Sequence, residues 1–290
     1  MFASFKRILR DAMPAAMWRA FRAVVGKILA ADFPLLLNQY PPLLLRSQPF
    51  RDFVISRNSM WRTDLSRSIA GRFSGCLERL GSDYGGWKVP VDLLGPNPIV
   101  YSLGVGTDVT FDLAVIDRCG AEVFAFDPTP AAIRHVEKVA SGMEKFRFLP
   151  LGIWSEDTEI KFFAPRRAEE DVSHSAVNLQ GTQDFFMAKV ITLRSAIKML
   201  GHHLIDYLKM DIEGAQFEVL KSALRDRVPF RILGVEIDQP SMLSRAVDLL
   251  KRLDAAGYEL IDIDGWNFLF IARRNLEEKI LRHASSATAD

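Results

Sequence analysis

Cysteine is scarce in this chain of 290 residues, which contains only Cys76 and Cys119. The two cysteines lie far apart and outside any C-x-x-C pair, so the sequence predicts neither a thiolate metal site nor a disulfide framework. A low cysteine content is typical of proteins in a reducing cytoplasm. We therefore expect a cytoplasmic protein without a thiolate-bound metal.

Long apolar runs are also missing. None approaches the roughly 20 residues that a membrane-spanning helix needs, because the most apolar stretch, residues 28–45, is interrupted by Asp32, Asn38 and three prolines. The N-terminus is positively charged but lacks the compact apolar segment and small-residue cleavage site of a secretory signal peptide. Zinc-ligand spacings and the H-E-x-x-H, P-loop and G-x-S-x-G motifs do not occur either.

Charge is unevenly distributed along the chain. Residues 1–72 carry 12 Lys and Arg against 4 Asp and Glu, whereas the remaining residues carry 25 against 32. Apolar residues recur at helical spacing from Pro14 to Leu29, which predicts an amphipathic helix with a basic polar face. Such a helix either packs on the rest of the protein or makes a peripheral contact with an anionic membrane surface. We assign residues 1–79 to a basic helical extension and residues 80–290 to the main domain.

Short apolar runs alternate with helical patterns from Pro98 onward. Strands are predicted at 99–103, 122–126, 146–149, 159–163, 205–210 and 232–237, and helices at 109–118, 130–139, 193–200, 215–224 and 240–256. Residues 46–97 are predicted as mixed helix and loop, and residues 165–190 as a loop-rich insertion. The alternation predicts an α/β protein with a doubly wound, mainly parallel sheet. Two final strands, at 258–263 and 267–271, flank a glycine turn and predict an antiparallel hairpin at the C-terminal end.

Two glycines, Gly104 and Gly106, follow the first strand of this sheet. Ligands of doubly wound sheets bind beyond the carboxyl ends of the strands, and glycine lets the backbone approach a ligand there. The dinucleotide fingerprint needs a third glycine, but Val109 occupies that position, and the loop contains no Lys or Arg for a phosphate. Asp108 instead adds an acid that suits an ammonium group. The loop therefore favours a sulfonium cofactor with an amino-acid tail over NAD.

Asp127 ends the second strand, 21 residues after Gly106. Its carboxylate can accept both hydroxyl protons of a ribose, as in sites for adenosine cofactors. Asp-Pro-Thr-Pro before a helix is also a typical N-terminal cap. Because the glycine loop lies at this distance, we predict that Asp127 binds a ribose.

Further carboxylates follow the fourth and fifth strands, namely Asp211 and Glu213, and Glu236 and Asp238. Helix capping accounts for one or two of them. The others predict recognition of a cofactor amine, a general base, or a divalent cation held by oxygen ligands. No sequence feature selects the cation over the other two roles.

His174 lies in a polar stretch that we expect to overhang the same edge of the sheet. A base with a pKa near neutrality suits deprotonation of a sugar hydroxyl. A solvent-facing loop histidine without a catalytic role is the alternative, and the sequence leaves both open.

The fourth strand carries the clearest family resemblance. Residues 208–220, LKMDIEGAQFEVL, resemble the fourth-strand signature of the FkbM family of methyltransferases. Residues 100–108, VYSLGVGTD, followed by FAFDP at 124–128, look like the branch that also contains animal methyltransferase-like proteins. The likeness covers about residues 80–273, which makes the main domain a predicted methyltransferase domain.

This resemblance implies a Rossmann-like class I methyltransferase fold that uses S-adenosyl-L-methionine, with members that often methylate hydroxyls of sugars or polyketides. From the resemblance together with the residue patterns above, we predict Gly104, Gly106, Asp108, Asp127, Gly152, Ile153 and Asp211 as cofactor-binding residues, with Gly152 and Ile153 beside the adenine. The predicted catalytic residues are His174, Asp211, Glu213 and Glu236, of which His174, Glu213 or Glu236 would orient or deprotonate the acceptor hydroxyl.

Two residues depart from the family pattern. Ser102 stands where many members have an acid in the loop after the first strand, and Gln216 stands where a glutamate is common. Cofactor affinity at the first position then rests on other groups, such as Asp108.

We expect a SAM-dependent O-methyltransferase that acts on a sugar, a glycan or a related small molecule. A binding protein that kept the fold but lost turnover is one alternative, supported mainly by Ser102, and an NAD-dependent oxidoreductase is another. Nucleic acid is not an expected partner, because the basic residues lack interleaved aromatics and the main domain is acidic. The sequence does not indicate the oligomeric state.

Overall fold

The computed structural model describes residues 48–73, 75–165, 173–178, 182–238 and 241–276. The amphipathic helix predicted from Pro14 to Leu29 lies outside these ranges, and its two alternatives stay predictions. By its internal contacts the chain divides into two compact units, residues 1–68 with 238–248 and residues 69–237 with 249–290. Among the described residues, no helix combines the length and apolar character needed to cross a membrane.

In the first unit the structure describes the long helix α4 (Gln48–Ile69), whose last residue belongs to the second unit. It is a continuous helix of 22 residues that carries four arginines. Within this unit, the side-chain amide of Asn58 donates a hydrogen bond of 2.8 Å to the carbonyl oxygen of Ser241. The expectation of mixed helix and loop for residues 46–97 therefore understated the helical content of this segment.

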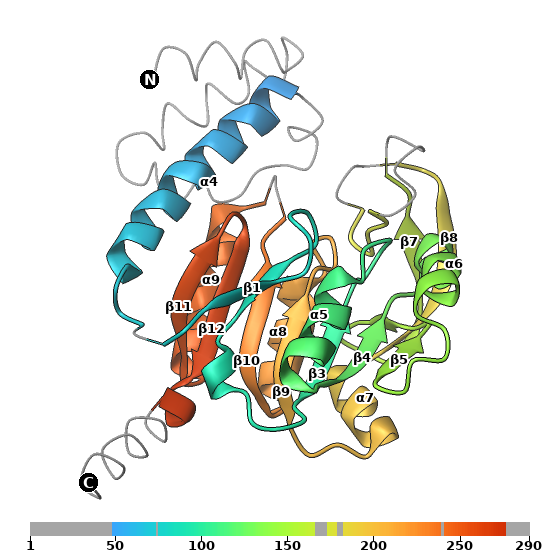
Figure 1. Ribbon diagram of the computed structural model, residues 1–290. Coiled ribbons are helices and arrows are strands. Elements are labelled where there is room, and N and C mark those ends of the chain that lie inside the picture. The colour runs from blue at the N-terminus through green and yellow to red at the C-terminus, as the bar shows by residue number, and fades with distance from the viewer. Residues whose placement is uncertain (1–47, 74, 166–172, 179–181, 239–240, 277–290) are drawn as a thin grey trace, which may run out of the picture. The chain divides into compact units, whose positions relative to one another are not determined.

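The second unit is built on a seven-stranded sheet with the order β11-β12-β10-β9-β3-β4-β5 (Figure 1). The strands are β3 (Ile99–Leu103), β4 (Glu122–Phe126), β5 (Phe146–Leu149), β9 (Ile205–Met210), β10 (Phe230–Glu236), β11 (Tyr258–Asp264) and β12 (Asn267–Ala272). β3, β4, β5, β9 and β10 pair in parallel, and β12 is antiparallel to both of its neighbours. The predicted mainly parallel sheet with a C-terminal hairpin is confirmed. The hairpin places its second strand next to β10 and leaves β11 at the edge.

Helices connect the parallel strands as predicted. They are α5 (Thr110–Cys119), α6 (Pro130–Val139), α7 (Leu193–Leu200), α8 (Gln216–Arg225) and α9 (Leu243–Ala255), the last of which spans the division between the two units. The side chains of Thr129 and Thr192 cap α6 and α7 by accepting hydrogen bonds from the backbone N–H three residues later. Gly120 and Gly201 end α5 and α7 in the left-handed conformation.

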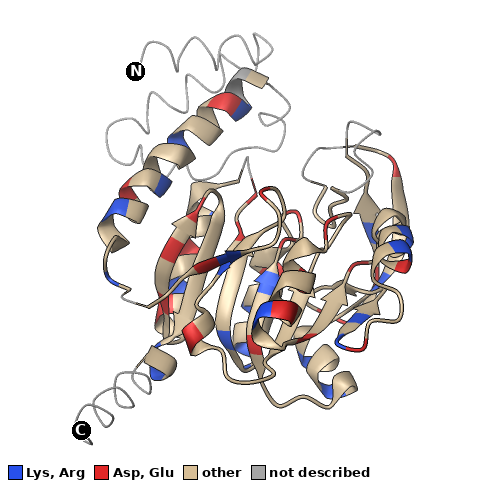
Figure 2. Ribbon diagram, viewed as in Figure 1, with Lys and Arg blue, Asp and Glu red and all other residues tan. Residues whose placement is uncertain are grey.

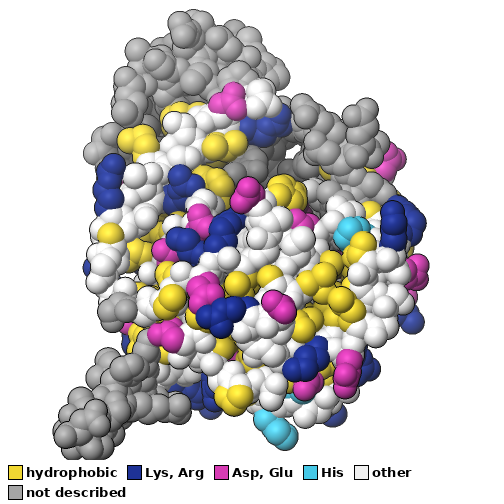
Figure 3. All heavy atoms as spheres, in the orientation of Figure 1, with side chains coloured by type: hydrophobic (Ala, Val, Ile, Leu, Met, Phe, Trp, Pro, Cys, Tyr) yellow, Lys and Arg dark blue, Asp and Glu magenta, His cyan; other side chains and the backbone are white. Residues whose placement is uncertain are grey.

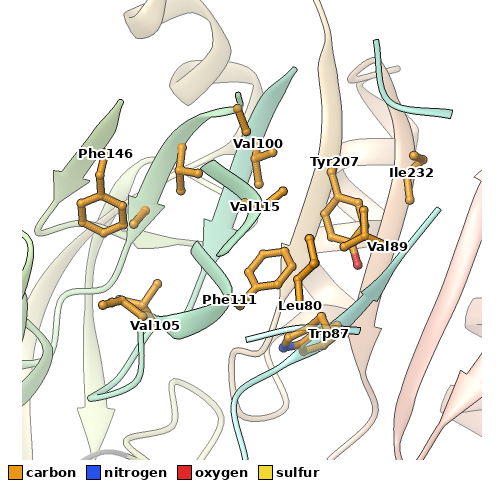
Figure 4. Close-up of a cluster of buried hydrophobic side chains, with 14 of the residues drawn as sticks. Leu80, Trp87, Val89, Val100, Val105, Phe111, Val115, Phe146, Tyr207 and Ile232 are labelled. Carbon is orange, nitrogen blue, oxygen red and sulfur yellow. The ribbon is translucent and has the colours of Figure 1, made fainter. Parts of the chain in front are cut away.

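A short antiparallel hairpin precedes the sheet, formed by β1 (Glu78–Leu80) and β2 (Trp87–Val89), and the 3-10 helix η2 (Val91–Leu93) follows it. The sequence analysis missed this hairpin because three-residue strands show no clear alternation. Its buried side chains Leu80, Trp87 and Val89 lie against Phe111 and Tyr207 in the main hydrophobic core (Figure 4). The hairpin thus covers part of one face of the sheet.

Gly234 in β10 makes room for this hairpin. A Cβ atom at this position would lie 2.6 Å from the hydroxyl oxygen of Tyr207 and 2.9 Å from the ring of Trp87. The same Tyr207 hydroxyl donates a hydrogen bond of 3.0 Å to the carbonyl oxygen of Lys88 in β2. Trp87 therefore packs directly on the sheet.

A separate three-stranded sheet has the order β6-β8-β7. Its strands are β6 (Gly152–Ile153), β7 (Thr158–Phe163) and β8 (Phe185–Ile191). The extra strand expected at residues 159–163 is confirmed as β7. The loop-rich insertion expected at 165–190 is wrong at its end, where residues 185–190 of β8 pair antiparallel with β7 and Ala188 and Val190 are buried.

Candidate active site

The glycine loop joins β3 to α5 at the carboxyl edge of the seven-stranded sheet. Gly104 and Gly106 both have positive φ angles, 74° and 52°. A Cβ atom on Gly104 would lie 1.7 Å from the carbonyl oxygen of Asp211, so the loop touches the segment after β9 backbone to backbone. Only glycine permits this approach. The two adjacent strand ends that the sequence singled out are therefore in direct contact.

Asp127 holds the glycine loop in place from the end of β4. One carboxylate oxygen accepts hydrogen bonds from the backbone N–H groups of Val105 at 3.1 Å and Gly106 at 2.9 Å. The other accepts from the backbone N–H of Thr129 at 2.8 Å and from its hydroxyl at 2.6 Å. A carboxylate has about four lone-pair sites, and these four donors use them. The predicted ribose contact stays a prediction, and it requires a ribose hydroxyl to share an oxygen with these donors.

Burial governs the ionisation of Asp127, which is almost fully removed from solvent. Burial raises the pKa of its carboxyl group, whereas the hydrogen bonds from Thr129, Gly106 and Val105 act to lower that pKa. The carboxyl group thus links the glycine loop to the start of α6 through hydrogen bonds.

Asp108 connects the glycine loop to the β1–β2 hairpin. Its carboxylate accepts a hydrogen bond of 2.6 Å from the Ser82 hydroxyl, and hydrogen bonds from the backbone N–H of Thr110 at 2.9 Å and from its hydroxyl at 2.5 Å. Partial burial opposes ionisation, but these hydrogen bonds lower the pKa of Asp108 below its ordinary value. The carboxylate is therefore anionic at neutral pH, as binding of an ammonium group requires, although that role stays a prediction.

Lys209 lies beneath the glycine loop, and the sequence analysis assigned it no role although it belongs to the fourth-strand signature. It is 4% exposed, and its ammonium group donates a hydrogen bond of 2.7 Å to the carbonyl oxygen of Gly104. The same nitrogen lies 5.5 Å from the centre of the Trp87 ring. The ammonium group of Lys209 is thus hydrogen-bonded to the glycine loop from its buried side.

Asp112 and Ser102 are fully buried on the same side of the sheet. Burial raises the pKa of Asp112 to about 6, while the positive charge of Lys209 and the hydroxyl of Ser102 act to lower that pKa. No pattern in the sequence distinguished this acid from the surface acids of a helix. Because Ser102 faces the interior, its departure from the family pattern does not alter the exposed edge.

Asp211 and Glu236 bring two carboxylates together at the ends of β9 and β10. Both side chains are half-buried, and one oxygen of each lies within 4.8 Å of the other. Oxygen pairs of this kind can ligate a divalent cation, but exposed acidic groups commonly lie this close without one. The cation considered from the sequence stays a prediction.

Glu213 and His174 are placed near this pair by the chain that surrounds them. Glu213 adopts a positive φ of 50°, and the buried Ser175 donates a hydrogen bond of 2.6 Å from its hydroxyl to the backbone carbonyl of Glu213. The half-buried His174 ring lies edge-on to Phe186, with ring centres 5.2 Å apart. The segment that carries His174 therefore contacts the segment that carries Glu213, and its role as a base stays a prediction.

Gly152 and Ile153 lie in β6 and are both buried. A Cβ atom on Gly152 would lie 2.8 Å from Val190 and 2.9 Å from the ring of Phe162, so this glycine allows close packing in the three-stranded sheet. A position beside an adenine stays a prediction for both residues.

Tyr84 follows the segment that contacts Asp108, and the sequence analysis gave it no role. It lies in the turn between β1 and β2 with 87% of its surface exposed. Partial desolvation of the hydroxyl group raises the pKa of Tyr84, and the charges of Asp211, Glu213, Glu236 and Asp108 raise it further. The phenol therefore lies within electrostatic reach of the acids at the sheet edge. Figure 2 shows acidic residues in the loops at the upper end of the sheet strands.

Comparison with known families shows the family to which this chain belongs. The profile of the methyltransferase FkbM domain matches residues 99–260, which is more than half of the chain and extends from β3 into β11. The chain belongs to the FkbM methyltransferase family. This finding confirms the resemblance based on residues 208–220, and the sheet order with its single antiparallel strand is the predicted Rossmann-like class I methyltransferase fold.

Solved structures of low sequence identity include proteins described as a methyltransferase, as a methylase, or with bound S-adenosyl-L-methionine. The human methyltransferase 10 domain containing protein is 14% identical over 87% of this chain and 94% of its own, with a TM-score of 0.38. Fibrillarin from Aeropyrum pernix, described with natively bound S-adenosyl-L-methionine, is 13% identical over 70% and 84%, with a TM-score of 0.39. An rRNA methylase from Streptococcus thermophilus is 12% identical over 62% and 88%, with a TM-score of 0.36. These scores are too low to carry an inference, and no curated protein matches the chain.

Proposed function

We propose that this FkbM-family methyltransferase binds S-adenosyl-L-methionine at the carboxyl edge of its sheet and methylates a hydroxyl group of a sugar, a glycan or a related small molecule. The observation that carries the proposal is the contact between the glycine loop and the acid-bearing segment after β9, where Gly104 meets the carbonyl of Asp211. Through this contact the glycine loop, whose backbone a ligand can approach closely, lies next to Asp211. Asp211 belongs to the group of carboxylates at this edge.

The chemistry of the edge suits this cofactor. S-adenosyl-L-methionine supplies a methyl group on a positively charged sulfonium, beside an α-amino group that is also positive. Asp108, Asp211, Glu213 and Glu236 provide acidic surroundings for both charges. Lys209 is engaged with the Gly104 carbonyl under the loop, so it does not offer its charge to a pyrophosphate. These features favour a sulfonium cofactor over a nicotinamide dinucleotide.

The acceptor hydroxyl must lose a proton as it is methylated, and several residues near the edge can accept it. His174 and Glu213 lie on segments joined by the hydrogen bond from Ser175, and Glu236 lies beside Asp211. A neutral imidazole or a carboxylate in these positions can act as general base. Since alignment of acceptor and methyl group supplies much of the acceleration in such transfers, the same residues also serve to orient the hydroxyl.

Calorimetric titration separates this function from its alternatives. We expect S-adenosyl-L-methionine and S-adenosylhomocysteine to bind with one-to-one stoichiometry and NADH not to bind. Binding of NADH without S-adenosyl-L-methionine would support an oxidoreductase and overturn the proposal. Cofactor binding without methyl transfer to any acceptor would favour the non-catalytic binding protein.

The acceptor class is tested by the chemistry of the product. Radiolabelled methyl transfer is measured from S-adenosyl-L-methionine to glycans, small hydroxylated metabolites, RNA and protein. We expect label in the glycan or small-molecule fraction, and mass spectrometry of the hydrolysed sugars should show a methyl ether that survives alkali. Label confined to RNA or protein would contradict the proposed acceptor while leaving the methyltransferase assignment intact.

A further inference from the structure

The turn between β1 and β2, residues 81–86, is fastened to the glycine loop and the start of α5. The Ser82 hydroxyl donates to Asp108 at 2.6 Å, and the Ser82 backbone N–H donates to the Thr110 hydroxyl at 2.8 Å. Inside the turn, the backbone N–H of Gly85 donates to the Ser82 hydroxyl at 2.8 Å, and that of Gly86 donates to the Ser82 carbonyl at 2.9 Å. This turn therefore has a defined conformation beside the cofactor loop.

Two glycines allow the turn to lie directly on its neighbours. Gly81 has a φ of 99°, and a Cβ atom there would lie 2.8 Å from the backbone nitrogen of Phe111. A Cβ atom on Gly85 would lie 2.6 Å from a carboxylate oxygen of Asp108. The turn is thus pressed against the first residues of α5 with no space for further side chains.

The stem of the hairpin is held from the other side by the C-terminal hairpin of the sheet. Arg79 pairs with Asp264 at 2.5 Å, and Lys88 pairs with Asp262 at 2.9 Å. Figure 3 shows basic and acidic side chains next to each other on the face of the molecule turned toward the viewer. Because Trp87 in β2 is also buried in the core, the stem is held both by ion pairs and by packing.

Tyr84 projects from this fixed turn and contributes little to the core. At 87% exposure it is the most exposed of the large hydrophobic side chains in the described residues. Its neighbours in the turn, Ser82 and Gly85, both lie against Asp108. In addition to partial desolvation, the negative charges of the acids at the sheet edge act on the phenol of Tyr84 and raise its pKa. An aromatic ring beside several carboxylates is the combination that recognises organic cations, because the ring face attracts positive charge and the acids add to the field.

We propose that Tyr84 determines specificity for the charged form of the cofactor by placing its ring over the sulfonium of S-adenosyl-L-methionine. This inference rests on the proposed function and deepens it, since it assigns the discrimination between substrate and product cofactor to one side chain. S-adenosylhomocysteine has the same nucleoside and amino-acid groups but a neutral thioether. Tyr84 therefore favours the cofactor that still carries its methyl group.

The experiment compares two ligands on four proteins by isothermal titration calorimetry. The ligands are S-adenosyl-L-methionine and S-adenosylhomocysteine, and the proteins are the wild type, Tyr84→Leu, Tyr84→Phe and Met199→Ala. Leucine keeps an apolar side chain without a ring, and phenylalanine keeps the ring without the hydroxyl. Met199 is an exposed residue at the end of α7, 52% exposed, and serves as a control for loss of surface apolar area.

We expect Tyr84→Leu to weaken binding of S-adenosyl-L-methionine by about 3- to 30-fold, the range of a cation–π contact. Binding of S-adenosylhomocysteine should change by less than about twofold under the same conditions, as should both affinities in Tyr84→Phe and Met199→Ala. Circular dichroism and the melting temperature should match the wild type, because the side chain is exposed.

Two results would overturn the inference in distinguishable ways. If the wild type binds both ligands but Tyr84→Leu weakens binding of both equally or not at all, Tyr84 does not distinguish the charged cofactor from the neutral one. The proposed function then still stands. If the wild type binds neither ligand, the proposed function fails and the inference fails with it.

Discussion

Two groups of acids lie at the same end of the central sheet, and they differ in what surrounds them. Asp127 and Asp112 are buried, where Asp127 accepts four hydrogen bonds from the protein and Asp112 faces Lys209. Asp211 and Glu236 are half-buried with carboxylates close to each other. Asp127 fixes the glycine loop, and the second group lies at the edge where we propose that the cofactor binds. Position at a strand end therefore does not by itself assign a role to an acid; its partners do.

The largest effect should come from Asp127→Ala. This change removes the acceptor of hydrogen bonds from Val105, Gly106 and Thr129, and the loop loses the group that fixes it to α6. Hydrogen bonds to a charged group contribute about 1.5–3 kcal/mol each. We expect binding of S-adenosyl-L-methionine to weaken at least about 100-fold by calorimetry, or about 3 kcal/mol.

The matched control is Asp157→Ala, since Asp157 also accepts hydrogen bonds at a helix start, from Thr192 and Ser195. Its loss should cost about 1 kcal/mol of stability without changing cofactor affinity. Equal cofactor affinity in Asp127→Ala and the wild type would show that Asp127 does not contribute to cofactor binding.

Asp112 should give stability an unusual pH dependence. Its pKa of about 6 exceeds the ordinary value of 3.8, so between these pH values the native state binds a proton that the unfolded state does not. Stability from this group is therefore gained as the pH falls from 7 toward 4 and lost as it rises. We expect the free energy of unfolding of the wild type to gain about 2–3 kcal/mol over that range relative to Asp112→Asn.

Urea unfolding of both proteins at pH 4.5, 5.5, 6.5 and 7.5 measures this difference. The comparison with the variant cancels other groups, including Asp127, whose pKa is also raised. A difference that is constant across pH would show that Asp112 is charged throughout or not buried.

Much of the fold was predictable because local signals agreed with the tertiary structure. α6 and α7 span the predicted ranges 130–139 and 193–200, and β3 and β9 are buried apolar runs with clear limits. β8 was missed because its partner β7 lies more than twenty residues away and its own pattern, FFMAKVI, alternates only in part. Pairing with β7, and not a local sequence pattern, therefore identifies residues 185–191 as a strand.

The grouping of several candidate residues was predictable, but their partners were not. Asp127 and Asp211 both contact the glycine loop, and Glu236 lies beside Asp211. The sequence could not show that protein donors occupy the Asp127 carboxylate, because those donors are backbone N–H groups. Tyr84 carried no motif, and the turn that holds it is positioned by the packing of Gly81 and Gly85 on their neighbours.

Asp211→Asn should show that Asp211 differs in role from the buried acids Asp127 and Asp112. The half-buried side chain makes no contribution to the core, so the free energy of unfolding should stay within about 0.5 kcal/mol of the wild type. Loss of its charge beside a cationic cofactor should weaken S-adenosyl-L-methionine about tenfold, or about 1.4 kcal/mol. Chemical denaturation and calorimetry on the same preparation measure both. A destabilisation comparable to that of Asp127→Ala would place Asp211 with the buried group.

The smallest effect is expected for Ser82→Ala, which removes the link between the hairpin turn and Asp108. Loss of this hydrogen bond and of the one from Gly85 should cost about 1 kcal/mol in the free energy of unfolding. The pKa of Asp108 should rise toward its ordinary value, because Ser82 is one of the groups that lowers it. Unchanged stability would show that the turn does not depend on Ser82.

A crystal structure with S-adenosylhomocysteine bound tests the central claim most directly. The account predicts the ligand at the carboxyl edge between the Gly104–Gly106 loop and Asp211, with Asp127 still accepting hydrogen bonds from Val105 and Gly106. Density for the ligand elsewhere, or an Asp127 carboxylate released from the loop to bind it, would contradict the division of the acids into structural and ligand-facing groups.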